Sequence, residues 1–235
     1  MKSRLVIGLL AAALLVACSQ QEQKRGDVEA SSERPDAQPA AQATPPTPSP
    51  ASTSANVQAA NAMAVQSRIC STQDPRCATA GPLQARSEAE AAWLIQHGYP
   101  SEQENAKLHA ESLGKLKELA AGGNRPAAVV YAEKLALEGG QFNEGFSLLH
   151  EQASSGNLFA YYGLSEVLYK DPTKGSLVDS AAYLKVAYLL GDTRASELLE
   201  RPNFGVAELL AADKRAAGLL QTFAGGVERS PRPLE

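Results

Sequence analysis

A five-residue pattern, Gly-Asx-x-x-Ala, occurs three times at nearly constant spacing in the second half of the chain. The copies begin at Gly123, Gly156 and Gly191, so their glycines lie 33 and 35 residues apart. Such a period is typical of helical-hairpin repeats, in which one unit of secondary structure recurs. A hairpin of this kind cannot bury its apolar face alone. The pattern therefore predicts a stack of helical hairpins.

Each copy of the pattern fits the junction between two helices. Glycine would end the first helix in the left-handed conformation, Asn or Asp would cap the second helix, and alanine would mark a close contact between helices. A leucine stands seven residues before each glycine, as one apolar stripe per helix requires. The predicted junction residues are Gly123, Asn124, Ala127, Gly156, Asn157, Ala160, Gly191, Asp192 and Ala195.

Helix-forming residue types dominate from residue 87 to 226, without the alternation of a strand. Ser87 to Glu90 and Ser101 to Glu104 both have the sequence of a capping box, and a final helix is expected from about residue 205 to 223. The predicted fold class is all-α: a short array of α-α hairpins over residues 87–226. Residues 227–235, which include Ser230-Pro231-Arg232-Pro233, are expected to form a frayed, flexible tail.

The repeat resembles the Sel-one-like family, which is related to the tetratricopeptide repeats. The best match runs from Gly156 to Ala195, and the loop over residues 171–176 departs from the Gly-x-Gly turn of the family. The resemblance implies an α-solenoid whose inner surface binds peptides or proteins. The matching apolar or small positions are Ala160, Leu164, Leu168, Tyr183, Ala187, Gly191 and Ala195.

Residues 1–17 have the layout of a secretory signal peptide, with a cationic start and an apolar run over residues 5–16. The following sequence Leu15-Val16-Ala17-Cys18 resembles the lipobox of bacterial lipoproteins, in which the cysteine is lipidated and becomes the mature N-terminus. This resemblance implies a lipid anchor at Cys18. Ser19, where retained lipoproteins usually carry Asp, implies the outer membrane, on the leaflet that faces the periplasm. The alternative is an ordinary signal peptide with a chance cysteine.

Residues 18–66 are predicted to be a disordered, lipid-anchored linker. No Phe, Tyr or Trp precedes Trp93, and residues 37–66 carry no charge, so this part of the chain cannot bury enough apolar surface to offset the entropy of ordering. Its prolines favour local polyproline II structure. At a flexible-chain reach of roughly 40 Å, such a linker would hold a domain clear of the bilayer.

Two cysteines remain after Cys18, in the predicted loop at residues 67–86. Cys70 and Cys77 form an even pair in an oxidising compartment, which favours a disulfide across the six intervening residues. A metal site is the alternative, but two thiols without a nearby histidine or second cysteine pair do not complete a tetrahedral set. The sequence therefore predicts a disulfide and no metal site.

Composition favours neither nucleic-acid binding nor catalysis. The formal charge of −4 is spread without a basic patch. The three histidines, His97, His109 and His150, form no metal-binding pair, and the glycines lack the context of a phosphate loop. The helical glutamates Glu133, Glu138, Glu144 and Glu151 are assigned to solvated faces. We therefore expect no enzyme activity, no cofactor and no nucleic-acid partner.

One helical stripe is a candidate protein-binding surface. Phe159, Tyr162, Glu166 and Tyr169 recur at spacings of three, four and three on the helix expected over residues 158–169. This stripe is separate from the apolar face that contains Ala160. The alternative is that these aromatic rings pack against the neighbouring helix, as most aromatic stripes do.

Anchor, linker and repeats together favour a periplasmic lipoprotein that acts as a non-enzymatic adaptor between envelope or secreted proteins. The alternative is an immunity or inhibitor lipoprotein that neutralises a toxin or hydrolase in the periplasm. In that case a projecting loop, residues 70–77 or 171–176, would dominate binding. The sequence does not identify the partner.

Overall fold

The computed structural model describes residues 59, 61–70, 77, 81–171, 173–223 and 229–233. The predicted signal peptide, the predicted lipidation site Cys18 and the predicted linker up to residue 58 lie outside these residues. Where the chain is described it is helical, and its only β feature is an isolated bridge between Ile69 and Ala85. The all-α prediction is therefore confirmed. None of the described helices combines the length and the apolar composition needed to cross a bilayer.

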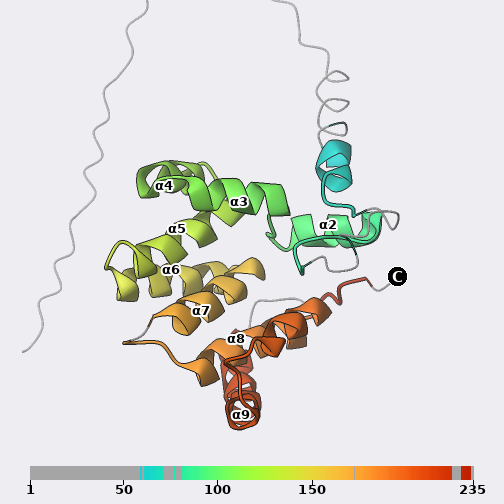
Figure 1. Ribbon diagram of the computed structural model, residues 1–235. Helices are drawn as coiled ribbons and strands as arrows, with labels where there is room; N and C mark the ends of the chain where they lie inside the picture. Colours follow the sequence, from blue (N-terminus) through green and yellow to red (C-terminus); the bar gives the residue numbers. More distant parts are fainter. Residues whose placement is uncertain are drawn as a thin grey trace, which may run out of the picture. The chain divides into compact units, whose positions relative to one another are not determined.

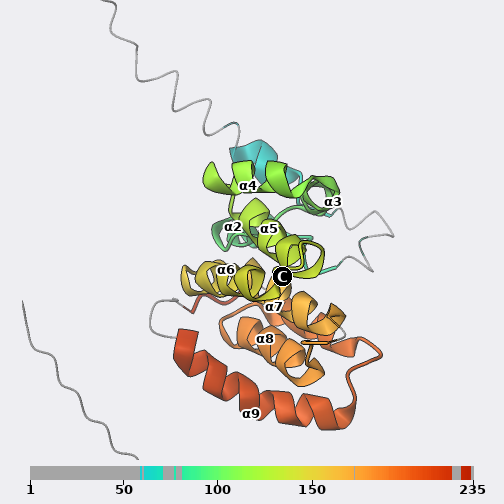
Figure 2. The same cartoon turned by 90° about the vertical axis from the view of Figure 1, so that its left-hand side faces the viewer.

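The helices from α4 to α9 succeed one another across the folded part of the chain (Figure 1). From α4 to α9 each α-helix packs against the next α-helix in the chain, and α5 also packs against α7 (Figure 2). The elements are α2 (Glu88–Gln96), α3 (Glu102–Ala110), α4 (Leu113–Ala121), α5 (Arg125–Leu137), α6 (Phe142–Ser154), α7 (Phe159–Lys170), α8 (Leu177–Leu189), the 3-10 helix η2 (Thr193–Glu200) and α9 (Val206–Phe223).

The three Gly-Asx-x-x-Ala segments lie at the junctions α4–α5, α6–α7 and α8–η2. Their glycines all have positive φ, 87°, 82° and 123° in chain order, as predicted. Asn124 caps α5 by accepting a hydrogen bond from the Ala127 amide at 2.8 Å, and Asp192 accepts from the Arg194 amide at 3.2 Å. The alanines Ala127, Ala160 and Ala195 are all fully buried.

Asn157 does not cap α7, so the prediction is wrong at this junction. Its side-chain amide instead donates to the Arg125 carbonyl at 3.3 Å and to Gln152 at 3.3 Å. The N-cap position belongs to Leu158, which has no capping side chain. Asn157 therefore links the start of α7 to the start of α5.

Helix α7 lies at the centre of the core. Ala160, Tyr161, Leu164 and Val167 on this helix are fully buried, because α5, α6 and α8 surround it. Gly163 permits a close approach of α6, since a Cβ at this position would lie 2.7 Å from Leu149 Cδ2. The apolar composition of α7 thus reflects burial on several sides.

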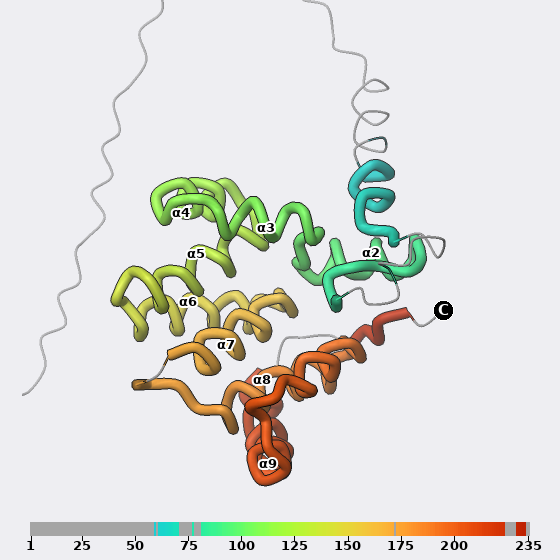
Figure 3. The backbone as a smooth tube through the Cα atoms, in the orientation of Figure 1, coloured from blue at the N-terminus to red at the C-terminus, as the bar shows by residue number. Residues whose placement is uncertain are grey.

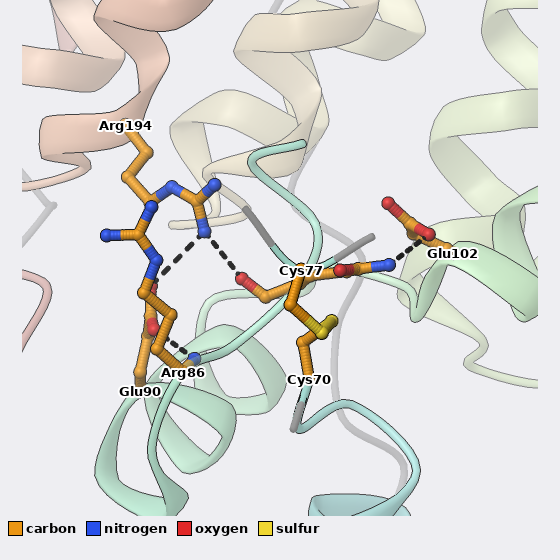
Figure 4. The surroundings of a disulfide bond; sticks show 7 residues. Cys70, Cys77, Arg86, Glu90, Glu102 and Arg194 are labelled. Carbon is orange, nitrogen blue, oxygen red and sulfur yellow. Dashed lines mark hydrogen bonds and ion pairs between the residues drawn. A yellow bond between two sulfur atoms is a disulfide. The ribbon is translucent and has the colours of Figure 1, made fainter. Parts of the chain in front are cut away.

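The segment before α2 belongs to the same folded unit. Residues 61–66 are helical, and Val65 and Ile69 pack against the core, so the predicted disorder does not hold for the last part of the linker. Cys70 and Cys77 form the expected disulfide, with Cα atoms 5.5 Å apart (Figure 4). The Cys70 amide donates to the Ala85 carbonyl at 2.8 Å. The disulfide and this hydrogen bond hold Cys70 close to Ala85, just before α2.

The C-terminal segment also packs against the helices, contrary to the prediction of a frayed tail. Residues 229–233 return to α2 from the far end of the chain (Figure 3). Trp93 Nε1 donates to the Ser230 carbonyl at 2.9 Å, and the Arg232 amide donates to the Gly191 carbonyl at 2.9 Å. The Arg232 side chain is fully buried. Its burial requires partners for the guanidinium, and these come from α2 and the α8–η2 junction.

Candidate binding site

A pocket of about 430 Å³ opens between alternate helical elements and the loop before α2. Its walls come from α3, α5, α7, η2 and the residues that flank η2 and α2. Helices α4, α6 and α8 contribute no lining residue. The lining residues are Gly81, Pro82, Leu83, Glu102, Asn105, His109, Glu133, Phe159, Tyr162, Gly163, Ser165, Glu166, Lys170, Leu198 and Arg201.

Glu166 pairs with both cationic side chains of the pocket. Its carboxylate lies 2.9 Å from Lys170 Nζ and 2.7 Å from Arg201 Nη1. Burial acts to raise the pKa of Glu166, but the hydrogen bonds from Lys170 and Arg201 outweigh burial, and the pKa is lowered. Glu166 is thus an ion-paired carboxylate at neutral pH.

Glu133 on α5 is the opposite case. It is 6% exposed, and within the described part of the chain no hydrogen bond or ion pair reaches its carboxylate. Burial raises its pKa to about 7, and nearby Glu166 and Glu138 add to the effect while Lys170 and Arg201 oppose it. Its oxygens are not sealed in the core and open onto the pocket. The sequence prediction of a solvated face is wrong for this residue.

The other polar groups of the pocket offer little positive charge. Burial, together with Lys170 and Lys134, lowers the pKa of His109, so its imidazole is neutral at pH 7. The Asn105 side-chain oxygen is buried without a hydrogen bond from any described residue. Glu102 accepts a hydrogen bond from Gln84. The pocket wall therefore combines the carboxylates of Glu102 and Glu133 with the Phe159 ring.

The predicted contact residues divide between the pocket and the core. Phe159 and Tyr162 are only 6% and 8% exposed, so the stripe is not an open surface and the alternative of core packing holds for them. Phe159, Tyr162 and Glu166 nevertheless line the pocket. Tyr169 does not line it; its ring packs edge-on against Phe204 at 5.4 Å.

Tyr162 connects this pocket to a second group of buried charges. Its hydroxyl donates to Asp192 at 2.5 Å, and Tyr99 donates to the same carboxylate oxygen at 2.6 Å. Burial and the Asp192 charge raise the pKa of both tyrosines well above the usual value, so both stay protonated donors.

Arg232 from the C-terminal segment neutralises this second group. Its Nε lies 2.6 Å from Glu90 and its Nη1 lies 3.0 Å from Asp192. Its guanidinium carbon lies 5.7 Å from the centroid of the Trp93 ring. Arg194 approaches Glu90 at 3.8 Å and donates to the Gln84 carbonyl at 2.8 Å (Figure 4). We refer to Glu90, Asp192 and Arg232 as the arginine cluster.

Sequence reasoning missed Glu133 and Arg232. For Glu133 the sequence carries a local signal. Glu133 and Lys134 are the only charged residues in the otherwise apolar run over residues 127–137. Arg232 stands between two prolines, which indicate an extended segment but not its burial. Nothing local could have shown that Arg232 contacts Glu90, 142 residues away.

Comparison with known proteins gives no match to a family model, a curated protein or a solved structure. Across the described residues, no group of three or more His, Cys, Asp or Glu side chains is placed to hold a metal ion.

Proposed function

We propose that the chain is a non-enzymatic adaptor lipoprotein of the cell envelope, which binds other proteins through Sel-one-like helical hairpins. The observation that carries this proposal is the pocket of about 430 Å³, lined by α3, α5, α7 and η2 and by none of the helices between them. In a solenoid, the first helices of successive hairpins form a common inner surface, and such surfaces bind extended protein segments.

The arrangement of the helices supports this assignment. Hairpins α5–α6 and α7–α8 pack so that α5 also contacts α7, as stacked repeats require. The left-handed glycines at the three junctions recur with the period of the repeat. A pocket of this volume is large enough to accommodate one or two side chains of a protein segment.

The proposed anchor at Cys18 gives the adaptor its location on the periplasmic side of the outer membrane. A tethered domain meets partners in the same thin layer at an increased effective concentration, so modest affinity suffices. The linker would let the domain reach roughly 40 Å from the bilayer. This combination favours binding over catalysis as the role of the chain.

Site-specific photocrosslinking in cells tests the proposal. A photoreactive residue at Leu198, in the pocket wall, is expected to trap one or a few defined envelope proteins. The matched control is the same residue at Glu144, an exposed position on α6 outside the pocket. Adducts at position 198 and not at 144 support the proposal. No adduct at 198, or identical adducts at both positions, would contradict it, and a secreted toxin as the adduct would favour the inhibitor alternative.

A further inference from the structure

The charges that line the pocket do not balance locally. Glu102, Glu133 and Glu166 face two cations, Lys170 and Arg201, and both cations are bound to Glu166. Glu102 accepts its hydrogen bond from a neutral amide. Glu133 is thus the buried carboxylate that no cationic side chain of the described residues reaches within ion-pair distance.

Burial without a partner is costly for a carboxylate, and the usual responses are a retained proton or a bound cation. The raised pKa of Glu133, about 7, shows that its charged form is poorly compensated by the groups around it. Glu102 adds a second carboxylate to the pocket wall, and Phe159 adds an aromatic ring. Such a lining suits a group with several N–H donors and a positive charge.

The arginine cluster shows how this protein compensates such a carboxylate elsewhere. There an arginine from an extended segment, flanked by Pro231 and Pro233, binds Glu90 and Asp192 and lies over Trp93. The pocket offers the same kinds of groups, a buried carboxylate and an aromatic ring, with Glu133 and Phe159 in these roles. Tyr162 belongs to both sites.

A second pocket, of about 410 Å³ between α6, α8 and α9, provides a contrast. Its carboxylate Asp179 is already bound by Arg215 at 2.6 Å. Lys174 lies over the Phe142 ring at 4.8 Å. This second pocket therefore has no uncompensated carboxylate and gives no comparable indication of a ligand.

We infer that the pocket between α3, α5 and α7 recognises a lysine or arginine side chain of the partner protein, with the Glu133 carboxylate as its ion-pair acceptor. This inference rests on the proposed adaptor function and specifies the chemistry of its partner. The cationic group would displace the proton from Glu133, and Phe159 would contact the methylene stem of the incoming side chain.

Selection from a random-peptide display library on the full-length chain tests this inference. The wild-type chain is expected to enrich peptides with one fixed Lys or Arg position. Glu133→Gln keeps the shape of the side chain and removes its charge, so this enrichment is expected to disappear. Glu138→Gln, at the C-cap directly after α5 and with an exposed carboxylate that pairs with Lys134, is the matched control and should enrich the same peptides.

The enriched peptide then permits a matched change on the ligand side. Replacing its fixed cation by citrulline or norleucine should weaken binding by about tenfold or more for the wild type and leave Glu133→Gln binding unchanged. Enrichment without a fixed cation, an unchanged selection by Glu133→Gln, or no enrichment at all would overturn the inference. The adaptor proposal fails separately, through the crosslinking result at position 198.

Discussion

The arginine cluster and the pocket lined by Glu133 differ in how the charge of a buried carboxylate is compensated. In the arginine cluster, Glu90 and Asp192 are neutralised by Arg232 of the same chain at 2.6 and 3.0 Å. In the pocket, Glu133 has no such partner among the described residues, and its pKa rises to about 7. The two sites are linked through Tyr162, which lines the pocket and donates to Asp192.

The difference distinguishes structural charges from charges available for binding. A buried ion pair whose partners all belong to the chain fixes the position of a segment, here residues 229–233, and offers nothing to a ligand. A carboxylate that opens onto a pocket without a cation is a cost to the folded state that a partner can remove.

The largest effect is expected from Arg232→Met. This change leaves Glu90 and Asp192 buried without their main cation, and breaking a buried pair in this way costs about 3–5 kcal/mol of unfolding free energy. Denaturant-induced unfolding at neutral pH measures the loss. Arg229→Met, at an exposed position of the same segment, is the control and should change stability by less than about 0.5 kcal/mol. Equal stabilities of the two variants would mean that the cluster does not hold the segment.

Gly191→Ala should displace the C-terminal segment without removing a charge. Gly191 has a φ of 123°, and a Cβ there would collide with the Ser230 carbonyl. Backbone strain and the collision together are expected to cost about 3 kcal/mol, again read from denaturant unfolding. Gly218→Ala lies within α9, where a Cβ meets nothing, and should instead be neutral or stabilise by up to about 1 kcal/mol. A destabilising Gly218→Ala would contradict this account of the two glycines.

Glu133→Gln should change the pH dependence of stability. With its pKa raised from 4.5 to about 7, Glu133 holds a proton in the folded state that the unfolded state loses at lower pH. The stabilisation that this proton gives the folded state is complete below about pH 4.5. It is lost as the pH rises to about 7, which lowers the free energy of unfolding by up to roughly 3 kcal/mol. The variant should therefore be more stable than the wild type at pH 8, with a difference that shrinks toward pH 5.

Comparing wild type and variant across pH isolates Glu133. His97 and His109, whose pKa values are lowered mainly by burial, favour the folded state as the pH rises toward 6.5, but they do so equally in both proteins. Parallel stability profiles for wild type and Glu133→Gln would show that the Glu133 carboxylate is already compensated.

The smallest effect is expected from Tyr162→Phe, which separates the two sites. It removes one of the hydrogen bonds to Asp192 while Tyr99 and Arg232 keep theirs, so the cost should be about 1.5 kcal/mol. Peptide selection by this variant should still depend on Glu133, because the ring remains in the pocket wall. Loss of selection together with normal stability would show that the hydroxyl itself acts in binding.

Local rules were enough for the junctions and the fold class. The positive φ values of Gly123, Gly156 and Gly191, the caps at Asn124 and Asp192, and the final helix follow from short-range sequence patterns. Asn157 does not cap α7, because its side-chain amide donates a hydrogen bond to the Arg125 carbonyl of α5 instead. Local chemistry therefore predicts elements well and their mutual contacts less well.

The candidate site was only partly predictable, because burial depends on contacts that are distant in sequence. The sequence singles out Phe159 and Tyr162, but their position in the wall of a pocket depends on α3, α5 and the loop before α2. For Glu133 the sequence predicts a solvated face, because helical glutamates are usually exposed. Its burial arises from the contacts of α5 with α3 and α7.

The most direct test of this account is an NMR titration of the Glu133 side-chain carboxyl carbon in the full-length chain, assigned with the Glu133→Gln variant. The account predicts a pKa near 7 for the protein alone and a value lower by at least about one unit once the selected cationic peptide is bound. A Glu133 pKa near 4.5 in the protein alone, or a raised pKa that the cationic peptide leaves unchanged, would contradict it.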